Sequence, residues 1–560
     1  MKKHIALLAV SLCLALTACE DDFLDRKIDT NYTEGQVFSS YTTIRNFGIG
    51  IYNYLPQGFD RIDGAMLASA TDDAVHTGVG RDIQRLTNGS WGPFNNPDEQ
   101  WGHYYAGIRK ANLFLEKTVG YKNTILRDTI TADGKQAYQV QSTELGLLRS
   151  EARFLRAYFY FELAKRYGGV PVITQVLSPD EDPGLSRSSF EETADFIVSE
   201  LAAVDAELRE SWVGVFDDGM IGRATKGAAL ALRARVLLYA ASPLHNPSGD
   251  RQKWVAAAAA AHQVIALSQY NLVNNYRNLF REMHNNEIIF ARRYAPSNGF
   301  ERSNFPVGFE GAVGGTNPSQ DLVNAYETKN GLSIEEDPAY NPQKPYTGRD
   351  PRLGMTVIVN DSDYKGRRVE IYPGGSDGPG RPRATRTGYY LKKYVDEGLD
   401  LQQNRTSNHT WIFFRYAEVL LNYAEAMNEA FGPDQIPADF TLSAREALNM
   451  VRSRNGVYMP AVEVMGQDAF REKVRNERRV ELAFEEHRFW DLRRWMIADE
   501  VLSTPINGVR VSPNADGSFD YNFLAQPVEQ RTFQDYMYLY PIPRIEIDKS
   551  EGRIAQNPGW

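Results

Sequence analysis

The stretch RNERRVELAFEEHRFWDLRRWM, Arg475 to Met496, says most about how this chain folds. It contains six arginines, five acidic residues and several large apolar side chains, with no Gly or Pro to interrupt a helix. The pattern therefore predicts a helix. Like charges fall four residues apart, as in Arg475 and Arg479 or Glu477 and Glu481, where they repel within a helix.

Charges placed in this way need partners on other elements. A guanidinium is a rigid fork that ties carboxylates and carbonyls on neighbouring segments, so we expect a tertiary ion network that includes Glu477, Glu481, Arg488 and Asp491. Two alternatives stay open. A basic helix that binds nucleic acid is disfavoured because acids nearly match arginines, and a catalytic carboxylate pair would need a pocket.

The composition narrows the classes of function. The 560 residues are 42% hydrophobic, enough for a large core, and the formal net charge is −10, which argues against nucleic acid as a ligand. No phosphate loop, HExxH, GxSxG or paired cysteine motif is present, so we predict a binding protein without cofactor or metal, not an enzyme.

The N-terminus has the features of an export signal. Residues 1–18 combine a basic start with an apolar run too short to span a bilayer, which predicts a signal peptide. The sequence Leu16 to Cys19, LTAC, resembles the lipobox of bacterial lipoproteins, which predicts lipidation of Cys19. Residues 19–30 then form an acidic linker, and we expect residues 31–560 to form a single domain. The predicted anchor is lipid, not a membrane-spanning helix.

Four stretches in order resemble the SusD/RagB family of surface glycan-binding lipoproteins. They are EARFLRAYFYFELAKRYGGVPV (151–172), FRYAEVLLNYAEAMNEA (414–430), ERRVELAFEEHRFWDLRRW (477–495) and YPIPRIEIDKSEGRIAQNPGW (540–560). One departure is His487, where the family pattern has glycine. The resemblance implies a mainly α-helical fold with tetratricopeptide-like helical hairpins, long irregular loops and short β hairpins.

The chain between these stretches reads mostly as helices joined by long loops. Capping residues and apolar spacing predict helices near residues 40–54, 98–117, 144–167, 189–210, 226–241, 252–267, 412–430 and 443–454, with Thr225 as an N-cap and Trp101 in the core. We expect a hairpin-like excursion at 121–141, a strand at 286–294 and irregular chain to about residue 405.

Candidate ligand residues lie in two loop regions. A pyranose ring stacks on aromatic faces, and its hydroxyls pair with amides, carboxylates and guanidiniums. The first region, 58–98, offers Asp72, Arg81, Trp91, Phe94, Asn95 and Asn96, and the second, after the 286–294 strand, offers Tyr294 and Phe305. Packing between loop and scaffold is the alternative for each aromatic, with about equal weight.

The resemblance implies a function on the cell surface. A SusD-like protein would sit on the extracellular face of the outer membrane, bind an oligosaccharide or polysaccharide fragment and deliver it to a SusC-like TonB-dependent transporter. The RagB branch of the family implies peptide capture as an alternative, and a surface glycoside hydrolase is a third, weaker one.

Overall fold

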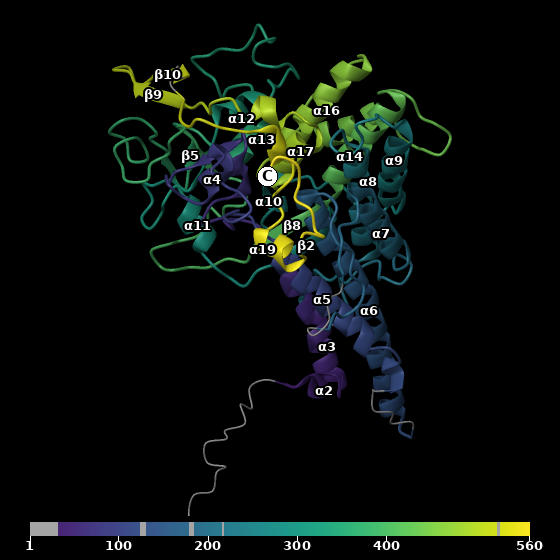
Figure 1. The fold of residues 1–560 in the computed structure, drawn as a ribbon. Coiled ribbons are helices and arrows are strands. Elements are labelled where there is room, and N and C mark those ends of the chain that lie inside the picture. The colour runs from purple at the N-terminus through teal and green to yellow at the C-terminus, as the bar shows by residue number, and fades with distance from the viewer. Residues whose placement is uncertain (1–31, 124–129, 179–183, 216–217, 524–526) are drawn as a thin grey trace, which may run out of the picture.

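The computed structural model describes residues 32–123, 130–178, 184–215, 218–523 and 527–560 (Figure 1). The predicted signal peptide, Cys19 and the acidic linker lie outside these residues. The described chain is mainly helical with short two-stranded sheets, so the predicted fold class is confirmed. Within the described ranges, every helix is too short or too polar to cross a bilayer.

The first half of the chain supplies most of the long helices. They are α2 (Glu34–Val37), α3 (Tyr41–Ile49), α4 (Ile83–Asn88), α5 (Trp101–Lys117), α6 (Ala132–Tyr167), α7 (Phe190–Ala202), α8 (Lys226–Ala241), α9 (Arg251–Ala266) and α10 (Tyr276–Leu279). Ser189 and Thr225 cap α7 and α8 by accepting a hydrogen bond from the backbone N–H three residues on. Consecutive helices pack in pairs, α6 with α7 and α8 with α9.

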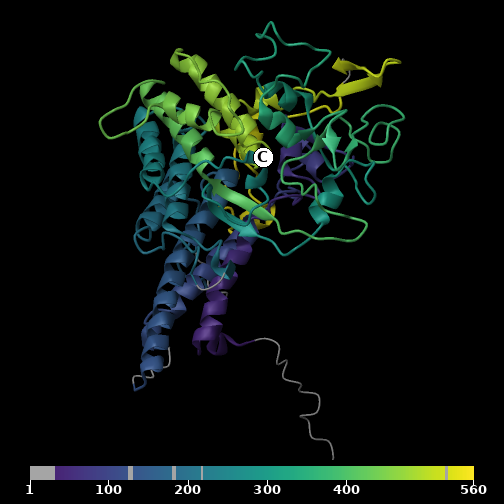
Figure 2. The same ribbon diagram turned by 180° about the vertical axis from the view of Figure 1, so that it is seen from behind.

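The second half continues this stack. Its helices are α11 (Gly299–Asn304), α12 (Gln320–Ala325), α13 (Pro351–Thr356), α14 (Tyr416–Phe431), α15 (Ala444–Arg452), α16 (Gln467–Glu481), α17 (His487–Arg494), α18 (Ala498–Val501) and α19 (Arg544–Lys549). Helix α14 packs against α9, α15 and α16, so the two halves share one core. Seen from behind, the helices gather on one side and the loops on the other (Figure 2).

Within the described residues, five antiparallel strand pairs hold the loops in place. They are β1 (Ala74–His76) with β3 (Thr316–Pro318), β2 (Ile288–Arg293) with β8 (Thr410–Arg415), β4 (Val357–Ile358) with β7 (Tyr390–Leu391), β5 (Asp363–Tyr364) with β6 (Arg367–Arg368), and β9 (Val509–Pro513) with β10 (Phe519–Phe523). The first pair sets Val75 opposite Asn317, which joins the two predicted ligand regions.

Several predicted boundaries are wrong. The helix predicted to run to residue 210 ends at Ala202. Residues 132–141 belong to α6, because Thr131 caps that helix and places Ala132-Asp133-Gly134 in its first turn. Residues 412–415 are strand, because the β-branched and aromatic run TWIFFR pairs with β2. The 475–496 stretch is two helices separated by a turn in which Phe484 and Glu486 adopt φ of 62° and 64°.

The turn lets two acidic residues reach one arginine. The Arg415 guanidinium donates to Glu481 and to Glu485 at 2.7 Å each, although these residues lie on either side of the helix end. Glu481 also accepts from Arg352 at 2.8 Å and from Arg454 at 2.9 Å. Burial opposes ionisation of Glu481, but the three guanidiniums outweigh burial and hold its pKa far below its ordinary value.

The other members of the predicted network pair in the same way. Glu477 accepts from Arg352 and Arg452, and Asp491 from Arg478 and Arg494, all with little or no exposure. Arg488 reaches further and pairs with Asp72 at 2.8 Å, while Arg479 bridges Asp72 and Asp73. These ion pairs connect the C-terminal helices to residues 58–98, which we call the N-terminal loop region.

Candidate functional site

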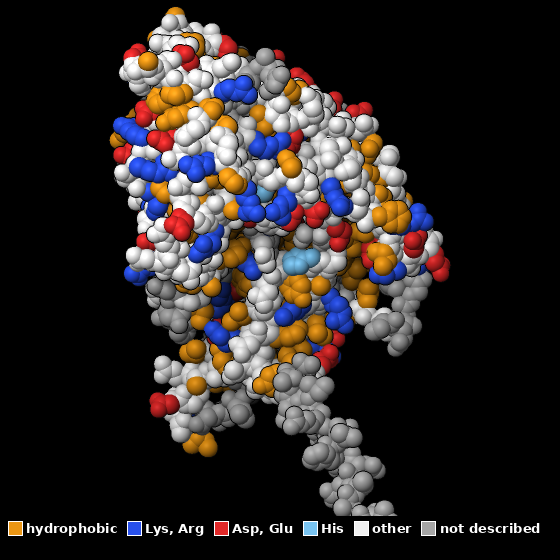
Figure 3. All heavy atoms as spheres, turned by 90° about the vertical axis from the view of Figure 1, so that its left-hand side faces the viewer, with side chains coloured by type: hydrophobic (Ala, Val, Ile, Leu, Met, Phe, Trp, Pro, Cys, Tyr) orange, Lys and Arg blue, Asp and Glu red, His pale blue; other side chains and the backbone are white. Residues whose placement is uncertain are grey.

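A cavity of about 260 Å³ lies where the two predicted ligand regions meet, with Arg81, just before α4, and Ser303 of α11 among its lining residues. We call it the loop pocket. It is lined by Asp63, Gly64, His76, Thr77, Gly78, Arg81, Ser303, Val313, Gly315 and Arg383. Figure 3 looks onto this side of the molecule, where basic side chains are scattered among hydrophobic and uncharged ones.

The β1–β3 pair holds the loop pocket together. Beyond the end of β1, the Thr77 N–H donates to the Gly315 carbonyl at 2.8 Å, and the Thr77 hydroxyl donates to the Arg383 carbonyl at 2.9 Å. Gly315 must be small here, since an added Cβ would lie 2.7 Å from the Ser303 carbonyl oxygen. The segments around Thr77, Gly315 and Arg383, which are far apart in sequence, are therefore held next to one another.

The charged groups of the loop pocket face solvent. Arg81 donates to Asp63 at 3.1 Å, and both side chains keep more than a third of their surface exposed. This exposed pair contributes little to stability, so both groups are available to a ligand. A guanidinium and a carboxylate side by side can donate to and accept from neighbouring hydroxyls of one sugar ring.

His76 is buried in the wall of the loop pocket. In the tautomer protonated on Nε2, its Nδ1 accepts from the Gly78 N–H at 3.1 Å and Nε2 carries the N–H donor. Burial lowers the pKa of His76, so the ring is neutral near pH 7. The imidazole thus adds one uncharged donor beside Gly315.

Asp60 lies behind the pocket wall and supports it. Asn304 donates to the Asp60 carboxyl at 3.3 Å and accepts from the Thr316 N–H of β3 at 3.0 Å. Burial raises the pKa of Asp60 to about 7, although hydrogen bonds from Asn304 and Ser303 oppose the shift. The carboxyl therefore changes charge close to neutral pH.

The structure places Arg81 in the loop pocket but buries other predicted ligand residues. Trp91 is 5% exposed, because its ring packs against Tyr540 and Trp560 with centroids 5.2 and 4.7 Å away. Phe305 is 1% exposed beside Tyr364, and Asp72 is occupied by its arginine pairs. The expectation of exposed ligand faces is therefore wrong for these three residues.

The remaining predicted residues lie outside the loop pocket. Phe94 and Asn95 are exposed, whereas Asn96 is half-buried and accepts from the Asp98 N–H at 3.0 Å. Tyr294 is half-buried against Phe59, and its hydroxyl accepts from the Gly58 N–H at 3.2 Å. Tyr294 therefore packs between the loop and the scaffold, which is the alternative to a role in stacking on a sugar ring.

Five polar residues of the loop pocket were not among the predicted ligand residues, namely Asp63, His76, Thr77, Ser303 and Arg383. His76 was visible in the same loop as Arg81, but nothing in the sequence paired it with residues 303 or 383. In the described part of the chain, no group of three or more His, Cys, Asp or Glu could hold a metal ion.

Two family profiles match the chain. One, described as the SusD family, matches residues 286–560, and the other, described as starch-binding associating with outer membrane, matches residues 22–238. The loop pocket takes Asp63 to Arg81 from the second region and Ser303 to Arg383 from the first.

Curated relatives and solved structures are similar over most of the chain. SusD-like protein P2 of Formosa agariphila is 26% identical over 74% of this chain and 75% of its own, and a SusD-like protein of Bacteroides ovatus is 24% identical over 100% and 97%. A SusD-like protein structure from Bacteroides fragilis has TM-score 0.75 and 29% identity, covering 94% of this chain and 99% of its own. A SusD-like carbohydrate binding protein of the same species has TM-score 0.74 and 26% identity, covering 92% and 99%.

Proposed function

We propose, from the premise that this chain belongs to the SusD/RagB family, that it binds oligosaccharides at the cell surface through the loop pocket. The captured sugar would pass to a SusC-like TonB-dependent transporter. Family membership supports glycan binding in general, and one solved relative is described as a carbohydrate binding protein. The assignment to this pocket is our own.

The proposal rests on the meeting of two family-matched segments at one cavity that several polar side chains line. The exposed Arg81 and Asp63, the neutral His76 and the Ser303 hydroxyl supply donors and acceptors within a fixed backbone frame. No Phe, Tyr or Trp is among the described residues that line the pocket, so hydroxyl recognition would dominate over ring stacking.

The anchor completes the proposal. Lipidation at Cys19 would hold the protein on the extracellular face of the outer membrane, in line with a family described as associating with that membrane. Replacing the thiol in Cys19→Ala should release the protein into the soluble fraction and abolish labelling by palmitate. Continued labelling and membrane retention would rule out Cys19 as the anchor.

Ligand binding should depend on the guanidiniums of the loop pocket. A glycan array identifies the best neutral oligosaccharide, and calorimetry then compares wild type with Arg81→Gln and Arg383→Gln. Loss of one charged hydrogen bond should weaken binding by about tenfold. Arg85→Gln, an exposed arginine of α4 outside the pocket, is the matched control and should bind as wild type does.

Other results would redirect the assignment. Peptides that co-purify with the protein, with no array signal, would favour peptide capture. Release of reducing ends from the bound glycan would favour a hydrolase, which uses two carboxylates flanking the bond. Array binding that Arg81→Gln and Arg383→Gln leave unchanged would move the site away from the loop pocket.

A further inference from the structure

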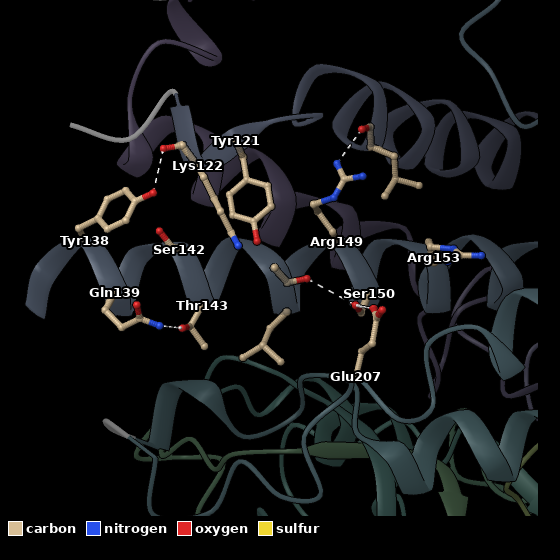
Figure 4. A pocket seen from close by; sticks show the side chains of 13 residues that line it. Tyr121, Lys122, Tyr138, Gln139, Ser142, Thr143, Arg149, Ser150, Arg153 and Glu207 are labelled. Carbon is tan, nitrogen blue, oxygen red and sulfur yellow. Dashed lines mark hydrogen bonds between the residues drawn. The ribbon is translucent and has the colours of Figure 1, made fainter. Parts of the chain in front are cut away.

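A second and larger cavity, of about 650 Å³, lies between α6 and the chain that leaves α5 (Figure 4). We call it the helix pocket and define it by Tyr121, Lys122, Tyr138, Ser142, Arg149 and Glu207. It shares no lining residue with the loop pocket. Its volume falls within the range of pockets that hold small organic ligands.

The helix pocket carries positive charge that the protein does not neutralise. Among the described residues, neither Lys122 nor Arg149 has a carboxylate within ion-pair distance, and Arg149 donates only to the Leu115 carbonyl and the Thr118 hydroxyl. Arg153, another lining residue, pairs with Glu200 at 2.8 Å. The Glu207 carboxylate accepts from the Ser150 hydroxyl at 2.5 Å and keeps its negative charge. Lys122 and Arg149 therefore outnumber the one unpaired carboxylate and leave the pocket with an excess of positive charge.

Ser142 points to the same conclusion independently. It is 6% exposed, and its hydroxyl has no hydrogen-bond partner among the described residues. Figure 4 shows its side chain on the face of α6 that is turned toward Tyr121 and Lys122. A buried hydroxyl without a partner costs free energy, which a ligand with acceptor oxygens would recover.

Two tyrosines give the helix pocket apolar surfaces. Tyr121 and Tyr138 are each half-buried, and the Tyr121 hydroxyl lies over Gly146, where an added Cβ would approach it to 3.0 Å. Tyr138 donates to the Lys122 carbonyl at 3.2 Å, which holds its ring at the pocket edge. Ring faces of this kind stack on the C–H surface of a pyranose.

We infer that the helix pocket is a second saccharide site, and that it takes an acidic sugar whose carboxylate or sulfate group lies against Lys122 and Arg149. The inference rests on the proposed function, because the ligand is assumed to be a saccharide. It adds that this protein selects charged glycans through a site away from the loop pocket.

Calorimetry on the purified full chain tests the inference with three probes. Tetragalacturonate carries carboxylates only, a carrageenan tetrasaccharide carries sulfates only, and maltotetraose is neutral. At low salt we expect at least one acidic probe to bind more tightly than maltotetraose, and to weaken at high salt. Tighter binding of tetragalacturonate would identify a carboxylate as the bound group, and tighter binding of the carrageenan tetrasaccharide would identify a sulfate. Either result supports the site.

Variants then locate the binding. Lys122→Gln should weaken the acidic probe by about fivefold, because Lys122 is exposed, and Arg149→Gln by about tenfold or more. Lys135→Gln, an exposed lysine of α6 outside the pocket, is the matched control and should bind the acidic probe as wild type does. Arg149 also donates to the Leu115 carbonyl, so Arg149→Gln can unfold the protein. In that case the binding measured with Lys122→Gln alone tests the site.

The outcomes separate this inference from the proposed function. Acidic binding that survives Lys122→Gln and Arg149→Gln, or that falls with Arg81→Gln instead, overturns the helix pocket and leaves the loop pocket in place. Equal affinity for acidic and neutral probes also overturns it. If no saccharide of the probes or of the glycan array binds, the proposed function fails, and this inference fails with it.

Discussion

Loss of Glu481 should cost much stability, because three arginines converge on its carboxylate. Glu481→Ala leaves these buried guanidiniums without their shared partner and should lower the free energy of unfolding by about 3–5 kcal/mol. Urea unfolding measures the change. Glu472→Ala, on the exposed face of the same helix, should stay within about 0.5 kcal/mol of wild type. Equal effects of the two variants would contradict the network.

Trp91 is a core residue by its contacts with Tyr540 and Trp560. Trp91→Ala should lower the free energy of unfolding by about 3–5 kcal/mol, since it leaves a cavity between the loop and the C-terminal residues. Phe94→Ala, three residues on and 85% exposed, is the control and should change stability by less than about 0.5 kcal/mol. Thermal melts that rank the two variants in the opposite order would restore Trp91 as a surface residue.

Asp60 should make stability depend on pH near neutrality. Its pKa is raised from 3.8 to about 7 in the fold, so the unfolded chain ionises first and the free energy of unfolding falls as pH rises from about 4 to about 7. Asp60→Asn removes this titration and should flatten the profile over that interval. Urea unfolding of both proteins at a series of pH values checks it, and parallel profiles would contradict the raised pKa.

Element boundaries were predictable where a local signal sets them. Ser189, Thr225 and Ser443 cap helices at the positions that their side-chain chemistry indicates, because an N-cap is settled within four residues. The turn at 482–486 was not predictable, because its left-handed residues are held by distant partners of Glu481 and Glu485. At this turn, the ion pairs with distant residues override the local preference of the sequence for a continuous helix.

Close packing between α5 and α6 depends on one glycine. A Cβ at Gly107 would lie 2.8 Å from the Phe159 ring, so Gly107→Ala should overpack the contact and cost about 1–3 kcal/mol. Gly102→Ala on the same helix meets nothing within 4 Å and should stabilise by up to about 1 kcal/mol through helix propensity. Thermal melts of the pair test the packing, and a stabilised Gly107→Ala would show that the helices can separate.

At the scale of the whole molecule, sequence reasoning found the regions of the candidate site but not its residues. The two loop regions were chosen for their composition, and Arg81 does line the pocket. Ser303 comes near it through the β1–β3 pair, and Arg383 through the hydrogen bond from the Thr77 hydroxyl. Trp91 was misplaced because an aromatic loop residue looks the same in sequence whether it faces solvent or the C-terminal residues. The residues that bury Trp91, and those that join Arg81 in the pocket, lie far away in sequence, so the sequence pattern does not indicate these contacts.

The link between the N-terminal loop region and α16 should govern how firmly that region is held. Arg479 pairs with Asp73, which is fully buried, so Arg479→Ala should cost about 3–5 kcal/mol. We expect limited proteolysis to cut the variant first within residues 58–98. Cleavage at the same sites and rates as in wild type would show that the β1–β3 pair alone secures the region.

The pairing of Asp72 and Asp73 with Arg479 and Arg488 also sets an order of events during synthesis. The partners lie 406 and 416 residues apart, so the carboxylates leave the ribosome long before the guanidiniums exist. Until then, burying the N-terminal loops would strand two charges, and the early chain has reason to stay open. We therefore expect the fold to close late, and a nascent chain that stalls before α16 to remain open to chaperones and proteases.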